Sequence, residues 1–224
     1  MAVQERWTKR ELERQLNGAL FERVVLSPVI VSPLVRQLHP DPSTIFKDTY
    51  LLDFLDLPAS HSEGDLQKGL VEQLQRFLIE LGSDFCFVGS RYQLQVGGKD
   101  FFVDLLFYHR GLSCLVAFVK IEEFEPSDLG QLQFYLEALD RDVKKPHEQP
   151  SIGVLLCATK NQEVVEYALS RTVSPALVAE YQSHLPDKKL LQAKLHEFYE
   201  LAQQQAAQAL EDKPAAKPRR TRNK

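Results

Sequence analysis

The sequence predicts an α/β fold, a mixed β-sheet core flanked by helices, and three observations support this class. Two strand-like runs between residues 101 and 121 are joined by the tight turn Arg110-Gly111. Residues 152–157 form a continuous apolar run, as expected for a strand buried on both faces. Amphipathic helical patterns precede, separate and follow these strands, as in a sheet covered on both sides.

The first 61 residues are expected to precede the sheet as a helix and a connector. Thr8 and Glu11 form a capping box before an N-terminal helix that ends near residue 24. Prolines interrupt the next stretch, so we expect residues 25–61 to be a connector that carries a short helix over 45–55. The apolar stripe of the first helix packs either on its own domain or on a protein partner or second copy, and the residues favour neither.

The main domain is expected over residues 62–210. A long helix over 62–81 should stop at Gly82. Strands are then expected over 85–88, 91–96, 101–109 and 112–121. A helix after Pro126, a strand over 152–157, a helix over 162–169, a strand over 176–181 and a long C-terminal helix over 187–210 complete the order. Residues 211–224 read as a disordered basic tail.

Composition is that of a core-forming protein, with 44% hydrophobic residues. No run of eighteen apolar residues occurs and the start lacks an export-signal pattern, so we expect a cytoplasmic protein with no membrane span. The three cysteines stand far apart inside apolar runs, which favours buried free thiols over a disulfide framework or a zinc site.

Charge is unevenly distributed along the chain. The net charge is −4, but residues 213–224 contain six basic residues and no acid, leaving 21 basic against 31 acidic residues elsewhere. The tail is either a contact for nucleic-acid phosphates or a solubilising end, with equal weight. Its candidate phosphate contacts are Lys213, Lys217, Arg219, Arg220 and Arg222.

Asp104 is an acid within an otherwise apolar strand. An unpaired carboxylate is costly to bury, and Lys120 on the next strand is the obvious partner. From the residues alone, a structural ion pair and a functional site have roughly even odds.

Several blocks in the same order resemble the YhcG-type bacterial proteins, which carry a PD-(D/E)XK nuclease-like domain. The blocks are residues 98–110, 114–117, 130–136 and 150–157, and the resemblance extends through residues 7–15, 51–55 and 179–181 and through Leu185-Pro186. The resemblance implies a restriction-endonuclease-like sheet, DNA as the substrate and Mg²⁺ as the cofactor if the protein is active, otherwise none. It also implies that residues 1–24 are the end of the family's upstream region.

The resemblance assigns roles by position. It makes Asp104 a metal ligand, Lys120 the catalytic lysine, and Gln131 an active-site contact paired with Tyr135 at i+4. Gln67 stands where the family has a supporting glutamate, and is a candidate substrate contact here.

Two departures weaken the implied site. Phe118 occupies the position two residues before the lysine where the family has a second acid, and Gln67 brings no charge. A migrated carboxylate from Glu122, Glu63 or Glu72 is a possible replacement, although sequence spacing argues against it. Phe118 instead adds buried apolar area worth on the order of 2 kcal/mol.

Three functions follow as hypotheses. The favoured one is a PD-(D/E)XK family protein that acts on or binds DNA, with catalysis weakened or lost. The alternatives are an active Mg²⁺-dependent endonuclease that uses Asp104, Lys120 and a migrated carboxylate, and a non-catalytic assembly subunit that docks through its first helix.

Overall fold

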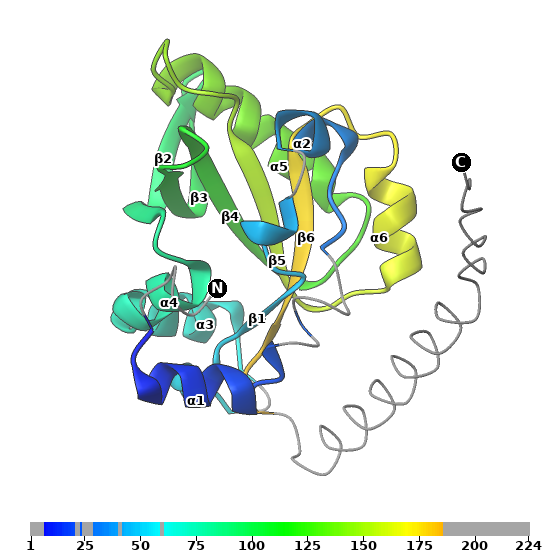
Figure 1. Ribbon diagram of the computed structural model, residues 1–224. Coiled ribbons are helices and arrows are strands. Elements are labelled where there is room, and N and C mark those ends of the chain that lie inside the picture. The colour runs from blue at the N-terminus through cyan, green and yellow to red at the C-terminus, as the bar shows by residue number, and fades with distance from the viewer. Residues whose placement is uncertain (1–6, 21–22, 24–28, 40–41, 59–60, 186–224) are drawn as a thin grey trace, which may run out of the picture. The chain divides into compact units, whose positions relative to one another are not determined.

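The computed structural model of this chain describes residues 7–20, 23, 29–39, 42–58 and 61–185 (Figure 1). The chain divides into two units, residues 1–185 and residues 186–224, and all the described residues lie in the first. The expected C-terminal helix over 187–210 and the basic tail therefore lie outside the described residues. Within the described ranges, no helix is long and apolar enough to cross a membrane.

A six-stranded mixed sheet forms the centre of the first unit, in the order β1-β6-β5-β4-β3-β2 (Figure 1). Its strands are β1 (Thr49–Leu51), β2 (Phe85–Val96), β3 (Lys99–His109), β4 (Cys114–Glu123), β5 (Ile152–Thr159) and β6 (Ala176–Gln182). Strands β2, β3 and β4 are antiparallel neighbours, whereas β4, β5, β6 and β1 run parallel. The predicted α/β class with a mixed sheet is confirmed.

Helices cover both faces of this sheet. They are α1 (Lys9–Asn17), α2 (Pro33–Leu38), α3 (Glu63–Glu72), α4 (Leu74–Leu81), α5 (Asp128–Ala138) with a π-helical turn at Leu139–Val143, and α6 (Gln162–Leu169). Side chains of α3 and α4 contribute to one apolar cluster, with Leu66 and Phe77 among its buried members. Side chains of α5 and α6 contribute to the cluster on the opposite face, including Leu132 and Val165. The core therefore has two layers, one on each side of the sheet.

The prediction of a short helix over residues 45–55 is wrong. The segment contains strand β1 between two 3₁₀ turns, Pro42–Thr44 and Asp53–Leu55. All three residues of β1 are buried and pair in parallel with β6, Tyr50 opposite Tyr181. Pairing with a strand far along the chain decides this element, and a local pattern does not reveal it.

Other boundaries also differ from expectation. The N-terminal helix, expected to end near residue 24, ends at Asn17 with Gly18 as its C-cap. Pro33 begins α2 inside the expected connector, because the first turn of a helix does not need a proline N–H. The helix expected over 62–81 divides at Gln73, whose φ of −105° and ψ of 27° separate α3 from α4. The two strands expected over 85–88 and 91–96 form one bulged strand, β2.

Of the three thiols expected to be buried, Cys86 is exposed, whereas Cys114 and Cys157 are buried.

Helix α1 lies with its polar side against the body of the unit. Its Thr8 cap accepts the N–H of Glu11 at 3.2 Å, as the capping-box pattern predicts. Gln15 is fully buried, whereas Leu12 and Leu16 of the apolar stripe are 36% and 59% exposed. The helix therefore does pack on its own domain, but mainly through charges and hydrogen bonds.

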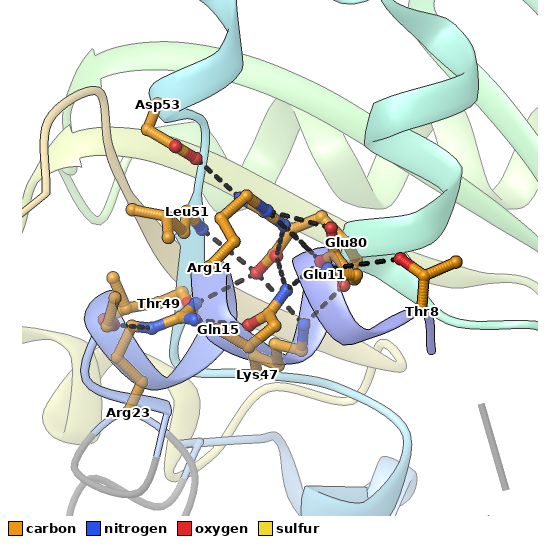
Figure 2. A network of polar contacts seen from close by, with 11 residues as sticks. Thr8, Glu11, Arg14, Gln15, Arg23, Lys47, Thr49, Leu51, Asp53 and Glu80 are labelled. Carbon is orange, nitrogen blue, oxygen red and sulfur yellow. Dashed lines mark hydrogen bonds and ion pairs between the residues drawn. The ribbon is translucent and has the colours of Figure 1, made fainter. Parts of the chain in front are cut away.

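The centre of this contact is Glu80 of α4, whose side chain is completely buried. Figure 2 shows Arg14, Arg23 and Lys47 gathered around its carboxylate. Their nitrogens lie 2.8, 2.9 and 3.0 Å from the Glu80 oxygens. Gln15 Nε2 and the Leu51 N–H donate to the same carboxylate at 2.6 and 3.1 Å. One buried acid therefore joins α1, β1 and α4.

Burial disfavours the charged form of Glu80, but Lys47, Arg23 and Arg14 outweigh it and hold its pKa well below the ordinary value of 4.5. Ionised Glu80 therefore contributes stability that is fully present above about pH 4.5. That stability is lost as the pH falls through the lower, folded-state pKa.

Replacing Glu80 with alanine should destabilise the protein by about 3–5 kcal/mol, because Arg23 and Lys47 would be left buried without a counter-charge. Urea unfolding at pH 7 measures the loss, and the variant should lose less stability than the parent between pH 4.5 and pH 3. The control is Glu137→Ala, which breaks the exposed pair with Arg141 and should change stability by under about 0.5 kcal/mol. Similar losses for the two variants would contradict the central role of Glu80.

Candidate functional site

Asp104 lies at a point in the β2–β3 hairpin where the regular alternation of side chains between the two faces of the sheet is broken. Val103 packs in the α5 and α6 cluster, whereas Leu105, two residues on, packs in the α3 and α4 cluster. Regular alternation would place both on one face. Across the ladder, Arg91 has a φ of 47°, a left-handed conformation within a strand. Asp104 therefore occupies a kink of the sheet.

The pairing between β3 and β4 also changes at this point. Its last regular pair is Leu105 with Phe118. Beyond it, Asp104 Oδ2 accepts the backbone N–H of Lys120 at 2.9 Å, so a side chain replaces the strand as the acceptor. The Lys120 ammonium lies 3.5 Å from Asp104 Oδ1. Both oxygens of this carboxylate thus face Lys120, and the contact expected between the two residues is present.

Lys120 is held from a second side by helix α3. Its Nζ donates to the Glu63 carbonyl at 3.1 Å, and its side chain is only 4% exposed. The carboxylate of Asp104 is 30% exposed. The pair therefore has a buried cation and an anion open to solvent on one side, and its net charge is near zero.

Phe118 points into the core and away from solvent. It is completely buried, and its ring meets those of Phe107, Phe77 and Tyr50 edge-on, with centroids 5.4, 6.0 and 6.2 Å away. Edge-to-face rings are favourable beyond their buried area. The position where the family resemblance places an acid is thus a packing position in this chain.

Gln67 reaches the same kink from α3. Its Nε2 donates to the Asp104 backbone carbonyl at 3.1 Å. Its Oε1 is buried and has no hydrogen-bond partner among the described residues. The glutamine thus lies beside Asp104, as the resemblance implies, but it brings an amide oxygen in place of a charge.

These residues do not fit the magnesium site that the resemblance implies. Mg²⁺ prefers several hard oxygen ligands, and two-metal sites depend on paired carboxylates. Here Asp104 offers one carboxylate, already paired with Lys120, and Gln67 offers one amide oxygen. Across the described part of the chain, no three His, Cys, Asp or Glu side chains are grouped to hold a metal.

Within the described residues, the possible replacement acids do not join Asp104 in a group of three or more metal ligands. Glu72 is exposed and pairs with Lys68 at 3.8 Å. Glu63 and Glu122 line an open depression at the end of β4 whose lining does not include Asp104, although the Glu63 carbonyl binds Lys120; the other acids around it are Glu123, Glu125 and Asp128. This acidic depression would repel a phosphate backbone and does not complete the Asp104 site.

Gln131 and Tyr135 form their expected i+4 contact on α5. Gln131 Nε2 donates to the Tyr135 hydroxyl at 2.8 Å. Tyr135 packs in the cluster on the opposite face of the sheet from Phe118. In the described structure, no hydrogen bond links this pair to Asp104 or Lys120. The candidate residues of the basic tail lie outside the described residues.

Arg91 and Phe102 were not singled out from the sequence, yet they flank Asp104. The Arg91 guanidinium lies over the Phe102 ring, 5.4 Å from its centroid. The sequence signal for this feature was the gap between the two strands expected over 85–88 and 91–96. At that point the structure has a register shift after Phe87 and the left-handed residue Arg91.

Phe118→Glu would restore an acid at the family position, but we expect it to destabilise the fold. The change removes ring packing worth about 3–5 kcal/mol and places a carboxylate in the aromatic cluster. Phe118→Leu should lose about 1–3 kcal/mol. Thermal and urea unfolding compare the two, with Tyr167→Glu, at a position 75% exposed, as a neutral control. Equal stability of the Glu and Leu variants would mean that the glutamate turns toward Asp104.

Comparison with known proteins agrees with the motif blocks. The family described as "YhcG PDDEXK nuclease domain" matches residues 43–196. "Putative nuclease YhcG" of Escherichia coli (strain K12) is 37% identical over 190 aligned residues, and the alignment covers 83% of this chain and 51% of that protein. The chain thus spans about half the length of this relative.

Two solved structures have some similarity, each over 58% of this chain. A repair endonuclease from Pyrococcus abyssi has a TM-score of 0.37 at 11% identity and is covered over 50% of its length. EndoMS in its apo form has a TM-score of 0.34 at 14% identity and is covered over 49%. The family match covers well over half of the sequence, and the chain belongs to the YhcG-type PD-(D/E)XK nuclease family, with its restriction-endonuclease-like fold.

Proposed function

We propose that this chain is a DNA-binding member of its family in which phosphodiester hydrolysis is weakened or lost. The single observation that carries the proposal is the burial of Phe118, at the position of the family's second acid, within an aromatic cluster. An aromatic side chain in that place supplies packing and no metal ligand.

Electrostatics around Asp104 support the same conclusion. A site that concentrates divalent metal needs excess negative charge, and here the one carboxylate is matched by Lys120 at 3.5 Å. The ammonium of Lys120 is itself held by Asp104 and by the Glu63 carbonyl. The pair is therefore stable without an ion, and its exposed side is free to contact a polar ligand.

A metal-dependent endonuclease of low activity is the second candidate. The buried Oε1 of Gln67 has no partner within the described residues and lies on the side chain that also contacts Asp104. Such an amide oxygen is a weak metal ligand. Glu63 is the candidate for a second carboxylate, because its backbone carbonyl already binds Lys120. An assembly role has its own support, because Leu12 and Leu16 of α1 face solvent.

We expect no cleavage of linear, circular or branched DNA in Mg²⁺ or Mn²⁺ above the level of an Asp104→Asn variant. The reason is the missing second carboxylate beside Asp104 in the part of the chain that the structure describes. Gel-based cleavage assays at matched protein concentration measure this, and gel shift in EDTA should show that both proteins still bind DNA. Cleavage by the parent that Asp104→Asn abolishes would establish the second candidate instead.

The basic tail is proposed to supply part of the non-specific affinity. Removing residues 213–224 takes away six positive charges from a chain whose other residues carry a net charge of −10. If the tail binds phosphates, the slope of log Kd against log salt should fall by about 0.9 for each duplex phosphate that the tail neutralises in the parent. Fluorescence anisotropy measures Kd for duplex DNA at several salt concentrations over about a fourfold range, roughly 50 to 200 mM NaCl, and gives the slope of log Kd against log salt. An unchanged slope would leave the tail as a solubilising end.

A further inference from the structure

The outer face of the β2–β3 hairpin is uncovered beside Asp104. Its inner face is packed, with Leu94 and Val103 buried and Phe101 meeting Phe134 of α5 at 4.6 Å. On the outer face, Phe102 is 42% exposed and lies two residues from Asp104. Two residues of a strand span about 6.6 Å, so the exposed ring and the carboxylate are close neighbours.

Arg91 completes this outer face from the opposite strand. Its neighbours Ser90 and Tyr92 pair with Leu105 and Val103, which places Arg91 across from Asp104. The guanidinium lies over the Phe102 ring at 5.4 Å. Its φ of 47° lies in the left-handed region, which is strained for a residue other than glycine. Strained residues of this kind cluster at ligand sites.

We propose that Arg91 and Phe102 form a platform that binds an unpaired nucleotide and leads its strand to Asp104. This inference rests on the proposed function and names its substrate as single-stranded or frayed DNA. A base stacks on the open side of the Phe102 ring, and the Arg91 guanidinium contacts the adjoining phosphate. A base inside a duplex stack does not offer a free π-face, so the platform selects unpaired nucleotides.

Charge favours this side of the site over the other. At the end of β4, five carboxylates line the acidic depression defined above, which repels phosphates. The hairpin carries Arg91 and Lys99 with Asp100 as its nearby acid, and Asp104 is matched by Lys120. A strand that reaches Asp104 therefore meets less repulsion along the hairpin.

The first test is the affinity for a fluorescent oligothymidylate and for a blunt duplex of the same length, measured by anisotropy in EDTA. Arg91→Gly and Phe102→Ala should each weaken single-strand binding about tenfold and duplex binding much less. The matched controls are Arg171→Gly, an exposed arginine next to α6, and Phe134→Ala on the other side of the hairpin. Both controls should bind like the parent.

Folding is separated from binding by the nature of the substitution. Glycine adopts a φ of 47° without strain, so Arg91→Gly should keep or raise the melting temperature while it loses affinity. Phe102→Trp in a Trp7→Phe background supplies a fluorescence reporter, since Trp7 is the chain's one tryptophan. Oligothymidylate should quench it, whereas Phe134→Trp in the same background should not respond.

The outcomes distinguish the platform from the proposed function. If the parent binds the oligonucleotide and both platform variants bind equally well, the platform is wrong and the proposed function stands. Equal weakening for single strand and duplex, without quenching of the Phe102→Trp reporter, would reject stacking in favour of charge alone. If the parent binds no DNA in any form, the proposed function fails and the platform fails with it.

Discussion

The buried carboxylate of Glu80 is the constraint on which the rest of this structure depends. Arg14, Arg23 and Lys47 all direct their charges to it, so α1, β1 and α4 are joined by one acid. Buried cations are tolerated only with such a counter-charge. The position of α4 then brings Phe77 against Phe118, and α3, which precedes it, brings the Glu63 carbonyl to Lys120. The polar network around Glu80 thus fixes the helices that hold the residues of the candidate site in place.

Core packing and catalysis make opposite demands on residue 118. A metal ligand there would need an exposed, hydrated carboxylate, whereas the ring of Phe118 is enclosed by Phe107, Phe77 and Tyr50. An acid in this cluster would lack hydrogen-bond partners, and its desolvation would exceed any gain from a nearby cation. The aromatic cluster therefore stabilises the sheet at the cost of the second metal ligand. Asp104 keeps its place because Lys120 compensates its charge from both backbone and side chain.

Sequence patterns were sufficient to predict the features that depend on residues close together along the chain. Two-residue alternation and turn residues located β3 and β4, and i+4 spacing predicted the contact of Gln131 with Tyr135. Long-range pairing was not visible, which is why β1 was taken for a helix. Glu80 follows the pattern of a solvent-facing helical charge, and only its distant partners explain its burial. The kink at Arg91 was not predicted from the sequence either, because arginine has no preference for a left-handed backbone conformation.

Losing a metal ligand does not weaken DNA binding by necessity, because metal-dependent nuclease sites are themselves repulsive until an ion is bound. Two or three clustered carboxylates oppose a phosphate, and the dication reverses that sign. In this chain the charge of Asp104 is matched by Lys120, and neither Phe118 nor Gln67 adds another. The site is therefore close to neutral without metal, and Arg91, which lies across the ladder from Asp104, adds a positive charge on the hairpin side. A nuclease fold altered in this way can approach a nucleic-acid strand without an ion, which is the electrostatic condition for a protein that binds DNA and leaves it intact.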